Sequence, residues 1–309
     1  MRKHPLRDKV INRFKEQWRL AKPKHSAQVE GFLTDVYDRF YAAGLADNHF
    51  ERELTNGNPN TYSQRVAELL LADMLWSDGF ELSSSSKGPD FKASKNGKST
   101  WIELITPEPC FALAELLAPN PGVHVRRFPH EEINLRWTSA ITEKARKLLG
   151  DRTSGKEGYI AQGIVHPDDS FILAINASLL ERMPSGGLYG ISQFPAPVEV
   201  LFGVGPIEVV ISHETGNIEG QHHQHRPKLV KKKTGSEVPS DSFLNSSYAP
   251  ISAVLGLSLC EAKALGEEHF SELVHNPLAL NPIEPDWLTA QRHWKCDINA
   301  DHYTVSPLE

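Results

Sequence analysis

The sequence predicts an α/β fold in which helices flank a mixed β-sheet in three layers, with a helical N-terminal part and a β-containing C-terminal part. Two observations lead to this prediction. Apolar residues recur every three or four positions near the N-terminus, whereas the middle of the chain alternates helical patterns with short apolar runs of strand length. The 309 residues, 39% hydrophobic and 23% charged, are ordinary for one large or two modest globular domains.

Residues 1–60 are expected to form a helical N-terminal region. Proline disfavours the helical conformation in the residue before it, so Lys22-Pro23 should separate two helices. The apolar positions that indicate these helices are Val10, Phe14, Trp18, Leu20, Val29, Phe32, Leu33, Val36, Tyr37, Phe40 and Tyr41.

The next helical pattern begins with Ser63 as the expected N-cap and runs to about Asp78-Gly79. Glu68 lies one position away from the apolar stripe of this helix and within reach of Arg65. Glu68 therefore either points along the rim of the core or forms a surface pair with Arg65. The stripe itself consists of Val66, Leu69, Leu70, Met74 and Leu75.

The stretch 88–107 is typical of a β-hairpin. Asn96-Gly97 is a preferred dipeptide for a type I′ turn, because both central residues need positive φ. Side chains alternate along a strand, so Trp101, Glu103 and Ile105 share one face. An unpaired buried carboxylate costs several kcal/mol, and Glu103 should therefore meet a cation, a metal or a hydrogen-bond network.

A helix and two strands are expected after the hairpin, which assigns residues 61–182 to one core. Thr138 is the expected N-cap of a helix that ends at Gly150, and Lys144 lies beside its apolar stripe. The strands are expected over Tyr159–Val165 and Phe171–Asn176.

Residues 183–309 are expected to form a C-terminal extension packed on this core. The expected elements are strands at Val198–Phe202, Ile207–Ser212 and Ile251–Leu259 and a helix at Pro285–Trp294.

A histidine-rich and lysine-rich segment lies within this extension. Clustered histidines suggest a metal, but adjacent residues on an extended chain point to opposite faces, and no acid adjoins them in sequence. The lysines suit either a phosphate backbone or the protection of an exposed edge strand. The residues concerned are His222, His223, His225, Lys228, Lys231, Lys232 and Lys233.

The charge and cysteine content exclude few functions. A net charge of −6 neither supports nor excludes nucleic-acid binding, because a local basic groove is compatible with an acidic total. Cys110, Cys260 and Cys296 lack metal-ribbon spacing, which favours a reducing compartment. The charged N-terminus lacks the apolar core of a signal peptide, and no run is apolar enough for a membrane span. We therefore expect a cytoplasmic protein without a membrane partner.

Three carboxylates are candidates for a metal site. Asp90 and Glu103 lie on adjacent predicted strands, and Glu68 lies on the preceding helix. Hard oxygen ligands of this kind suit Mg²⁺ or Mn²⁺, which keeps several waters and accepts a substrate phosphate as a further ligand. Such a site predicts phosphodiester hydrolysis.

This order of residues resembles the PD-(D/E)XK superfamily, the restriction-endonuclease-like nucleases. Pro89-Asp90 matches the P-D element, Glu103 matches the second acid and Glu68 matches the helix acid. The stretches A-E-L-L-L-A-D-M-L, W-I-E-L-I-T-P and F-I-L-A-I-N also resemble an uncharacterised bacterial branch of this fold. The resemblance implies a restriction-endonuclease-like core and a Mg²⁺-dependent nuclease that acts on DNA, with these three acids as metal ligands.

The sequence departs from this pattern at Ile105, which occupies the usual lysine position two residues after Glu103. Lys144 is our candidate replacement, and Lys147 is the second. A cationic donor near the developing phosphorane charge is worth on the order of several kcal/mol, so its position decides between an active and an inactive site.

Three alternatives stay open. The first is a catalytically inactive nuclease-fold protein that acts as a nucleic-acid-binding or assembly module in bacterial defence or DNA processing, as a homodimer or with a partner protein. The second is another hydrolase, such as a glycosidase, that uses Asp90 and Glu103. The third is a purely structural role, in which Glu103 pairs with Arg65 or Lys144.

Overall fold

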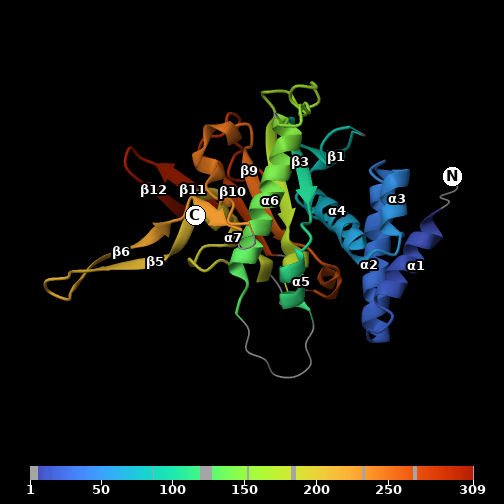
Figure 1. Cartoon of the computed structure of the whole chain (residues 1–309). Coiled ribbons are helices and arrows are strands. Elements are labelled where there is room, and N and C mark those ends of the chain that lie inside the picture. Colours follow the sequence, from blue (N-terminus) through green and yellow to red (C-terminus); the bar gives the residue numbers. More distant parts are fainter. Residues whose placement is uncertain are drawn as a thin grey trace.

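The computed structural model describes residues 6–85, 87–118, 127–151, 153–181, 186–231, 234–266 and 270–308. The protein is an α/β protein with a helical N-terminal part, a mixed eight-stranded sheet with helices on it and small C-terminal hairpins (Figure 1). Most of the expected irregular connection between Pro119 and Pro129, and Lys232 and Lys233 of the basic segment, lie outside the described residues.

The helices and strands are distributed along the whole chain. The α-helices are α1 (Arg7–Gln17), α2 (Pro23–Ala42), α3 (Asn48–Leu54), α4 (Pro59–Ser77), α5 (Phe111–Leu117), α6 (His130–Leu149) and α7 (Ala196–Phe202). The strands are β1 (Glu81–Ser83), β2 (Phe91–Lys95), β3 (Lys98–Ile105), β4 (Ser170–Asn176), β5 (Val204–Ile211), β6 (Ile218–His225), β7 (Lys228–Val230), β8 (Glu237–Pro239), β9 (Ala253–Ser258), β10 (Phe270–His275), β11 (Arg292–Ile298) and β12 (Tyr303–Pro307).

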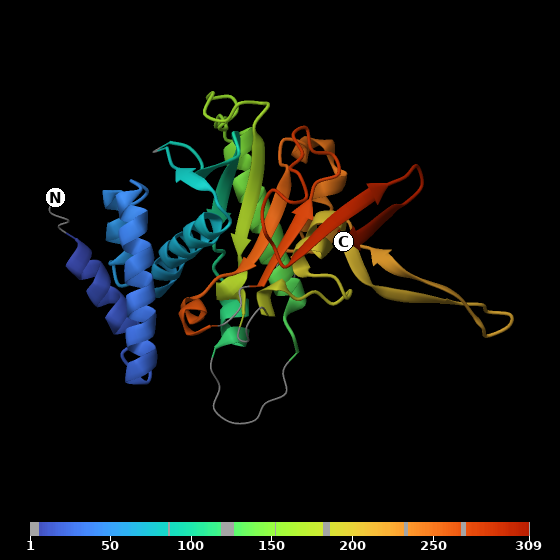
Figure 2. The same ribbon diagram turned by 180° about the vertical axis from the view of Figure 1, so that it is seen from behind.

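The prediction of a helical N-terminal region is confirmed. Helices α1 and α2 meet at the predicted break, and Pro23 occupies the first turn of α2, where its missing N–H costs nothing. Arg7 Nη2 lies 2.6 Å from Asp38 Oδ2 and joins the two helices. Leu20 was expected in the core but is 91% exposed, because it lies in the turn between them. The helices stand at one end of the molecule (Figure 2).

Helix α4 begins earlier than predicted. Its N-cap is Asn58, whose side chain accepts hydrogen bonds from the N–H groups of Asn60 and Thr61, with Pro59 at the first helical position. Ser63 lies inside the helix and donates its hydroxyl to the carbonyl of Pro59, so its predicted capping role is wrong. The predicted end at Asp78 is confirmed.

The eight strands follow the order β1-β2-β3-β4-β9-β10-β11-β12. Strands β1, β2 and β3 form an antiparallel meander, and Asn96 and Gly97 adopt φ values of 53° and 77° in the predicted tight turn. Strand β4 is parallel to β3 and to β9, which makes it the central strand that its apolar sequence predicts. A parallel neighbour requires a long crossover, and α6 lies within the one that joins β3 to β4.

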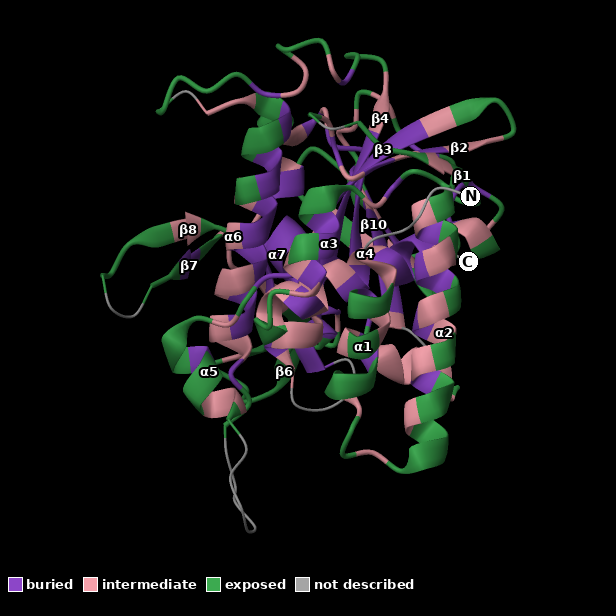
Figure 3. Cartoon of the chain, turned by 90° about the vertical axis from the view of Figure 1, so that its right-hand side faces the viewer, coloured by how far each residue is buried: buried purple, intermediate pink, exposed green. Residues whose placement is uncertain are grey.

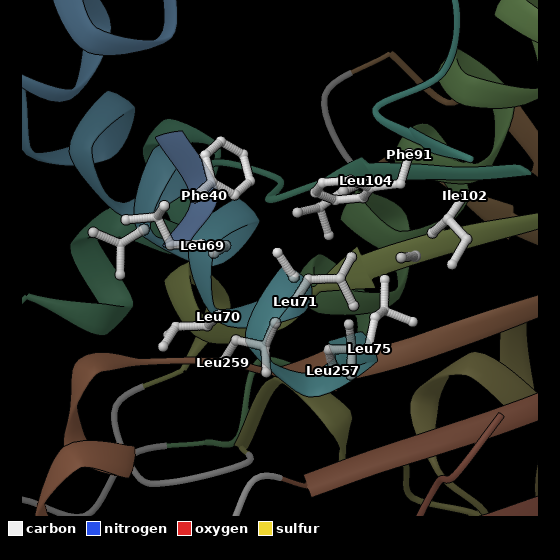
Figure 4. Packing of buried hydrophobic residues seen from close by; sticks show 14 of the residues in the cluster. Phe40, Leu69, Leu70, Leu71, Leu75, Phe91, Ile102, Leu104, Leu257 and Leu259 are labelled. Atoms are coloured by element: carbon white, nitrogen blue, oxygen red, sulfur yellow. The ribbon is translucent and has the colours of Figure 1, made fainter. Parts of the chain in front are cut away.

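The alternation along β3 gives each face of the sheet its own core. Ile102 and Leu104 join the apolar cluster that includes α4 and the N-terminal helices, part of which is shown in Figure 4. Trp101 lies in the other cluster with α6 and α7, and Ile105 packs against it. Figure 3 shows the burial of the central strands between these layers. Glu103 therefore faces α6.

The C-terminal part contributes strands to the same sheet. Strand β4 pairs with β9 over residues 172–176 and 253–257, and β10, β11 and β12 continue the sheet beyond it. The remaining strands form two separate hairpins, β5 with β6 and β7 with β8. The hairpin of β5 and β6 projects from the body of the protein (Figures 1 and 2).

Two predicted strands are wrong. Val198–Phe202 belongs to helix α7, because the run is buried on every side and such a short apolar segment fits either structure. Tyr159–Val165 forms successive turns, in which Gly163 adopts a φ of 69°.

Two helix assignments also need correction. Helix α6 begins at His130 rather than at Thr138, whose hydroxyl donates to the carbonyl of Leu135 within the same helix. The predicted helix over Pro285–Trp294 is wrong, since this segment turns and then enters β11 at Arg292. None of the helices in the described ranges combines the length and the apolar character that crossing a membrane requires.

Candidate active site

A pocket of about 380 Å³ opens at the C-terminal end of β3, between α4 and α6. The two helices and the strand end bring charged side chains of both signs to its wall. These are Glu68, Asp90, Glu108 and Glu143 among the acids and Arg65, Arg136, Lys144 and Lys147 among the bases.

Glu103 is 1% exposed and lies behind the lysines of this pocket. Lys144 Nζ donates to Glu103 Oε1 at 2.7 Å, and Lys147 Nζ donates to the same oxygen at 2.9 Å. The hydroxyl of Tyr159 approaches the other carboxylate oxygen at 3.4 Å. The expectation that Glu103 meets a cation is therefore confirmed, and two lysines supply it.

The two lysines reach Glu103 because they are three residues apart on α6 and thus share one face of the helix. The side chain of Lys144 is 9% exposed, whereas that of Lys147 is 46% exposed. Burial opposes the charge of Lys147, but Glu103 outweighs it and raises the pKa of Lys147. The cation expected at Ile105 thus comes to the same face of the sheet from a neighbouring helix.

Asp90 lies directly after Pro89 and immediately before β2, which begins at Phe91, rather than on the strand as predicted. Its Oδ2 accepts a hydrogen bond from the N–H of Leu104 at 2.6 Å. Burial raises the pKa of Asp90 to about 6, and the nearby negative charge of Glu103 adds to this effect, whereas Lys144 opposes it. Asp90 and Glu103 are therefore close enough to repel one another.

Glu68 projects from α4 into the same pocket. Arg65 Nη1 donates to Glu68 Oε1 at 2.5 Å, and Arg65 Nε lies 3.0 Å from Glu53 Oε2. The two roles foreseen for Glu68, at the rim of the core and as the partner of Arg65, thus occur together. Burial raises the pKa of Glu68 to about 8, and Asp90 contributes further, against the opposing charge of Arg65.

The acids fit a hard divalent cation better as a pair than as a trio. In the described part of the chain, no three His, Cys, Asp or Glu side chains are grouped so that they could hold a metal ion. Mg²⁺ needs only one or two protein carboxylates, with waters and a substrate phosphate as its other ligands. Asp90 and Glu68 suit this requirement, because the negative charge of Asp90 raises the pKa of Glu68 and a cation near them would relieve this repulsion.

The histidine segment forms no such site. His222, His223 and His225 lie along β6, where successive side chains alternate between faces. His223 Nδ1 lies 3.0 Å from the carbonyl of Gly205, and His222 Nε2 lies 3.6 Å from Glu208 Oε2 across the hairpin. His222 thus meets an acid on the opposite strand of the hairpin, and the candidate metal cluster does not converge.

Several pocket residues escaped the sequence analysis. Arg136 fell outside the predicted helix, because that helix was started at Thr138, and Tyr159, which contacts Glu103 but does not line the pocket, was assigned to a strand. The available signal was the pair Glu131-Glu132, which is typical of a first helical turn and would have extended α6 to include Arg136. No comparable sequence pattern identified Glu108 or Glu143 as residues of the pocket.

Comparison with protein-family models, with curated proteins and with solved structures gave no match. The functional argument therefore depends on the pocket and its charges.

Proposed function

We propose that the chain is a Mg²⁺-dependent nuclease that hydrolyses phosphodiester bonds in DNA. The observation that carries the proposal is the buried contact of 2.7 Å between Lys144 and Glu103, formed at the wall of the pocket that Lys144, Asp90 and Glu68 line. This places a cationic donor beside the acids, although the sequence position that usually supplies it holds Ile105.

In this proposal the residues have separate roles. Asp90 and Glu68 are the acids that would hold Mg²⁺ or Mn²⁺, Glu68 would also orient the attacking water, and Glu103 would position Lys144. The bound ion would polarise the scissile phosphate and lower the pKa of a water. Lys144, held by Glu103, would stabilise the negative charge that develops on the phosphate oxygens.

The arrangement of elements around the acids also supports the proposal. An acid-bearing helix, α4, precedes the meander, Asp90 comes immediately before β2, Glu103 lies on β3, and α6 precedes the parallel strand β4. This is the order that the resemblance to the PD-(D/E)XK nucleases implies. The free thiols of Cys110 and Cys296, within the described part of the chain, fit the cytoplasmic location that we include in the proposal.

A second candidate function is a nuclease-fold protein that binds nucleic acid or assembles with a partner without cleaving. The observation that favours it is the double contact of Lys144 and Lys147 with one oxygen of Glu103, which occupies that oxygen without a metal. Binding by such a module would be unchanged by a chelator.

Cleavage assays separate these functions. The purified protein and the variant Asp90→Asn are incubated with single-stranded and double-stranded DNA and RNA, with Mg²⁺, with Mn²⁺ or with EDTA. The matched control is Asp297→Asn, an exposed carboxylate on β11. We expect metal-dependent cleavage by the wild type and the control, and a loss of at least a hundredfold in Asp90→Asn. Equal residual cleavage by all three proteins would contradict the nuclease proposal.

A further inference from the structure

Arg136 differs from the other cations of the pocket in having no ionic partner. Arg65 pairs with Glu53 and Glu68, and both lysines bind Glu103. Arg136 has neither an ion pair nor a side-chain hydrogen bond within the residues that the structure describes. The pocket therefore contains one guanidinium whose charge is not neutralised by a direct contact.

The Nε atom of Arg136 is buried and has no hydrogen-bond acceptor. A buried donor without a partner costs about 1–3 kcal/mol, and more when the group is charged. Glu143, which lies on the same helix and lines the same pocket, does not take up this donor. An acceptor oxygen supplied by a ligand would satisfy it.

The position of Arg136 on α6 sets its distance from the other cations. Arg136 precedes Lys144 by eight residues, which is about 12 Å at the rise of an α-helix, and Lys147 lies one turn further on. Arg136, Lys144 and Lys147 thus form a row of cations along α6, and one phosphate group is too small to contact both Arg136 and Lys147. The row instead suits a strand that carries several phosphates.

We propose that Arg136 binds a second phosphate of the nucleic-acid strand, next to the scissile phosphate at Lys144, and thereby selects a substrate that extends beyond the cleaved bond. The planar guanidinium can donate two parallel hydrogen bonds to phosphate oxygens, which a lysine cannot do. This inference rests on the proposed function for the identity of the anion. Arg136 would hold the nucleic-acid strand so that the scissile phosphate lies at Lys144.

Equilibrium binding tests this assignment without cleavage. The probe is a fluorescent single-stranded oligonucleotide in EDTA, titrated with wild type, Arg136→Gln and Arg136→Lys at several salt concentrations. The control is Arg19→Gln, which removes an exposed arginine that follows α1 and does not line the pocket. We expect Arg136→Gln to bind about tenfold more weakly and to reduce the salt slope by about one contact. Arg136→Lys should recover the slope and only part of the affinity, while Arg19→Gln should match the wild type.

A scan with single methylphosphonates identifies the contacted phosphate. In the wild type one position should weaken binding most, and in Arg136→Gln the same substitution should have no further effect. Wild-type affinity and slope in Arg136→Gln, or no binding by the wild type, would overturn the assignment. Because Arg136 has no partner among the described residues and its buried Nε is unsatisfied, its variants should melt at or above the wild-type temperature. If the binding tests fail but cleavage depends on Asp90, only the assignment of Arg136 is wrong. If cleavage fails but the binding tests succeed, only the nuclease proposal is wrong.

Discussion

Lys144 Nζ lies 2.7 Å from Glu103 Oε1, although 41 positions separate the two residues in the chain. The contact forms because β3 turns Glu103 towards α6, and because the crossover to β4 lays α6 over that face of the sheet. Both groups are almost fully removed from water, so each one depends on the other for a counter-charge.

Replacing Lys144 should therefore destabilise the protein. Removing one partner of a buried ion pair leaves an uncompensated charge, and we expect Lys144→Met to lower the free energy of unfolding by about 3 kcal/mol, measured by urea denaturation. Lys147→Met should cost below about 1 kcal/mol, because Lys147 is half-exposed. The double variant Glu103→Gln with Lys144→Met should recover part of the loss. A change below about 0.5 kcal/mol in Lys144→Met would show that Lys147 alone compensates Glu103.

Replacing Asp90, unlike replacing Lys144, should stabilise the folded protein. Its pKa is raised to about 6 from an ordinary value of 3.8, so ionisation is less favourable in the folded protein than in the unfolded chain. Stability should consequently fall as the pH rises from about 3.8 to about 6. Asp90→Asn removes this cost and keeps an oxygen that accepts from the N–H of Leu104.

Thermal melting without divalent ions measures this effect. Asp90→Asn should melt a few degrees above the wild type at pH 8 and at the same temperature as the wild type at pH 3.5. A lower melting temperature of Asp90→Asn at pH 8 would instead assign Asp90 a structural role.

A divalent ion should offset the loss of folding stability that the ionised side chain of Asp90 causes. Binding to the folded state alone stabilises a protein by about 2.7 kcal/mol at a ligand concentration one hundred times the Kd. We expect Mn²⁺ to raise the melting temperature of the wild type, and EDTA to return it. Asp90→Asn and Glu68→Gln should lose most of the increase, whereas Asp297→Asn, an exposed carboxylate, should keep it. An equal increase in every variant would place the ion elsewhere.

The hairpin was predictable because its signals are local. Asn96-Gly97 determines a turn that needs two positive φ values, and the period of two places Glu103 on one face of β3. The need of a buried carboxylate for a cation follows from solvation alone. The sequence thus predicted what Glu103 requires and named Lys144, beside Arg65, as a possible partner. Lys147 was considered only as a replacement for the lysine missing at position 105.

The missed features depend on tertiary contacts. The run that became α7 is buried on every side, Glu199 included, so its pattern could not distinguish a helix from a strand. Thr138 has the side chain of an N-cap, but its hydroxyl bonds inside α6. The late start assigned to α6 then excluded Arg136 from the site. The sheet pairing of β4 with β9 joins residues about 80 positions apart, a separation that no local pattern encodes.

A pair of histidines away from the pocket should govern stability in acid. His275 Nε2 lies 3.3 Å from His293 Nδ1 on the parallel strands β10 and β11. Burial lowers the pKa of His275 to about 4, and the charge of His293 lowers it further. A histidine with a depressed pKa in the folded state contributes its full stability above about pH 6.5, and this stability is lost as the pH falls towards 4.

We therefore expect His275→Phe to lose less stability than the wild type between pH 7.5 and pH 4.5, as measured by urea denaturation at each pH. The comparison between variants cancels the contribution of Asp90, which changes in the opposite direction over part of this range. His213→Gln, an exposed histidine between β5 and β6, should keep the wild-type pH dependence. If His275→Phe follows the wild-type curve, protonation of His275 does not drive the loss, because a buried histidine that titrates normally would contribute no slope.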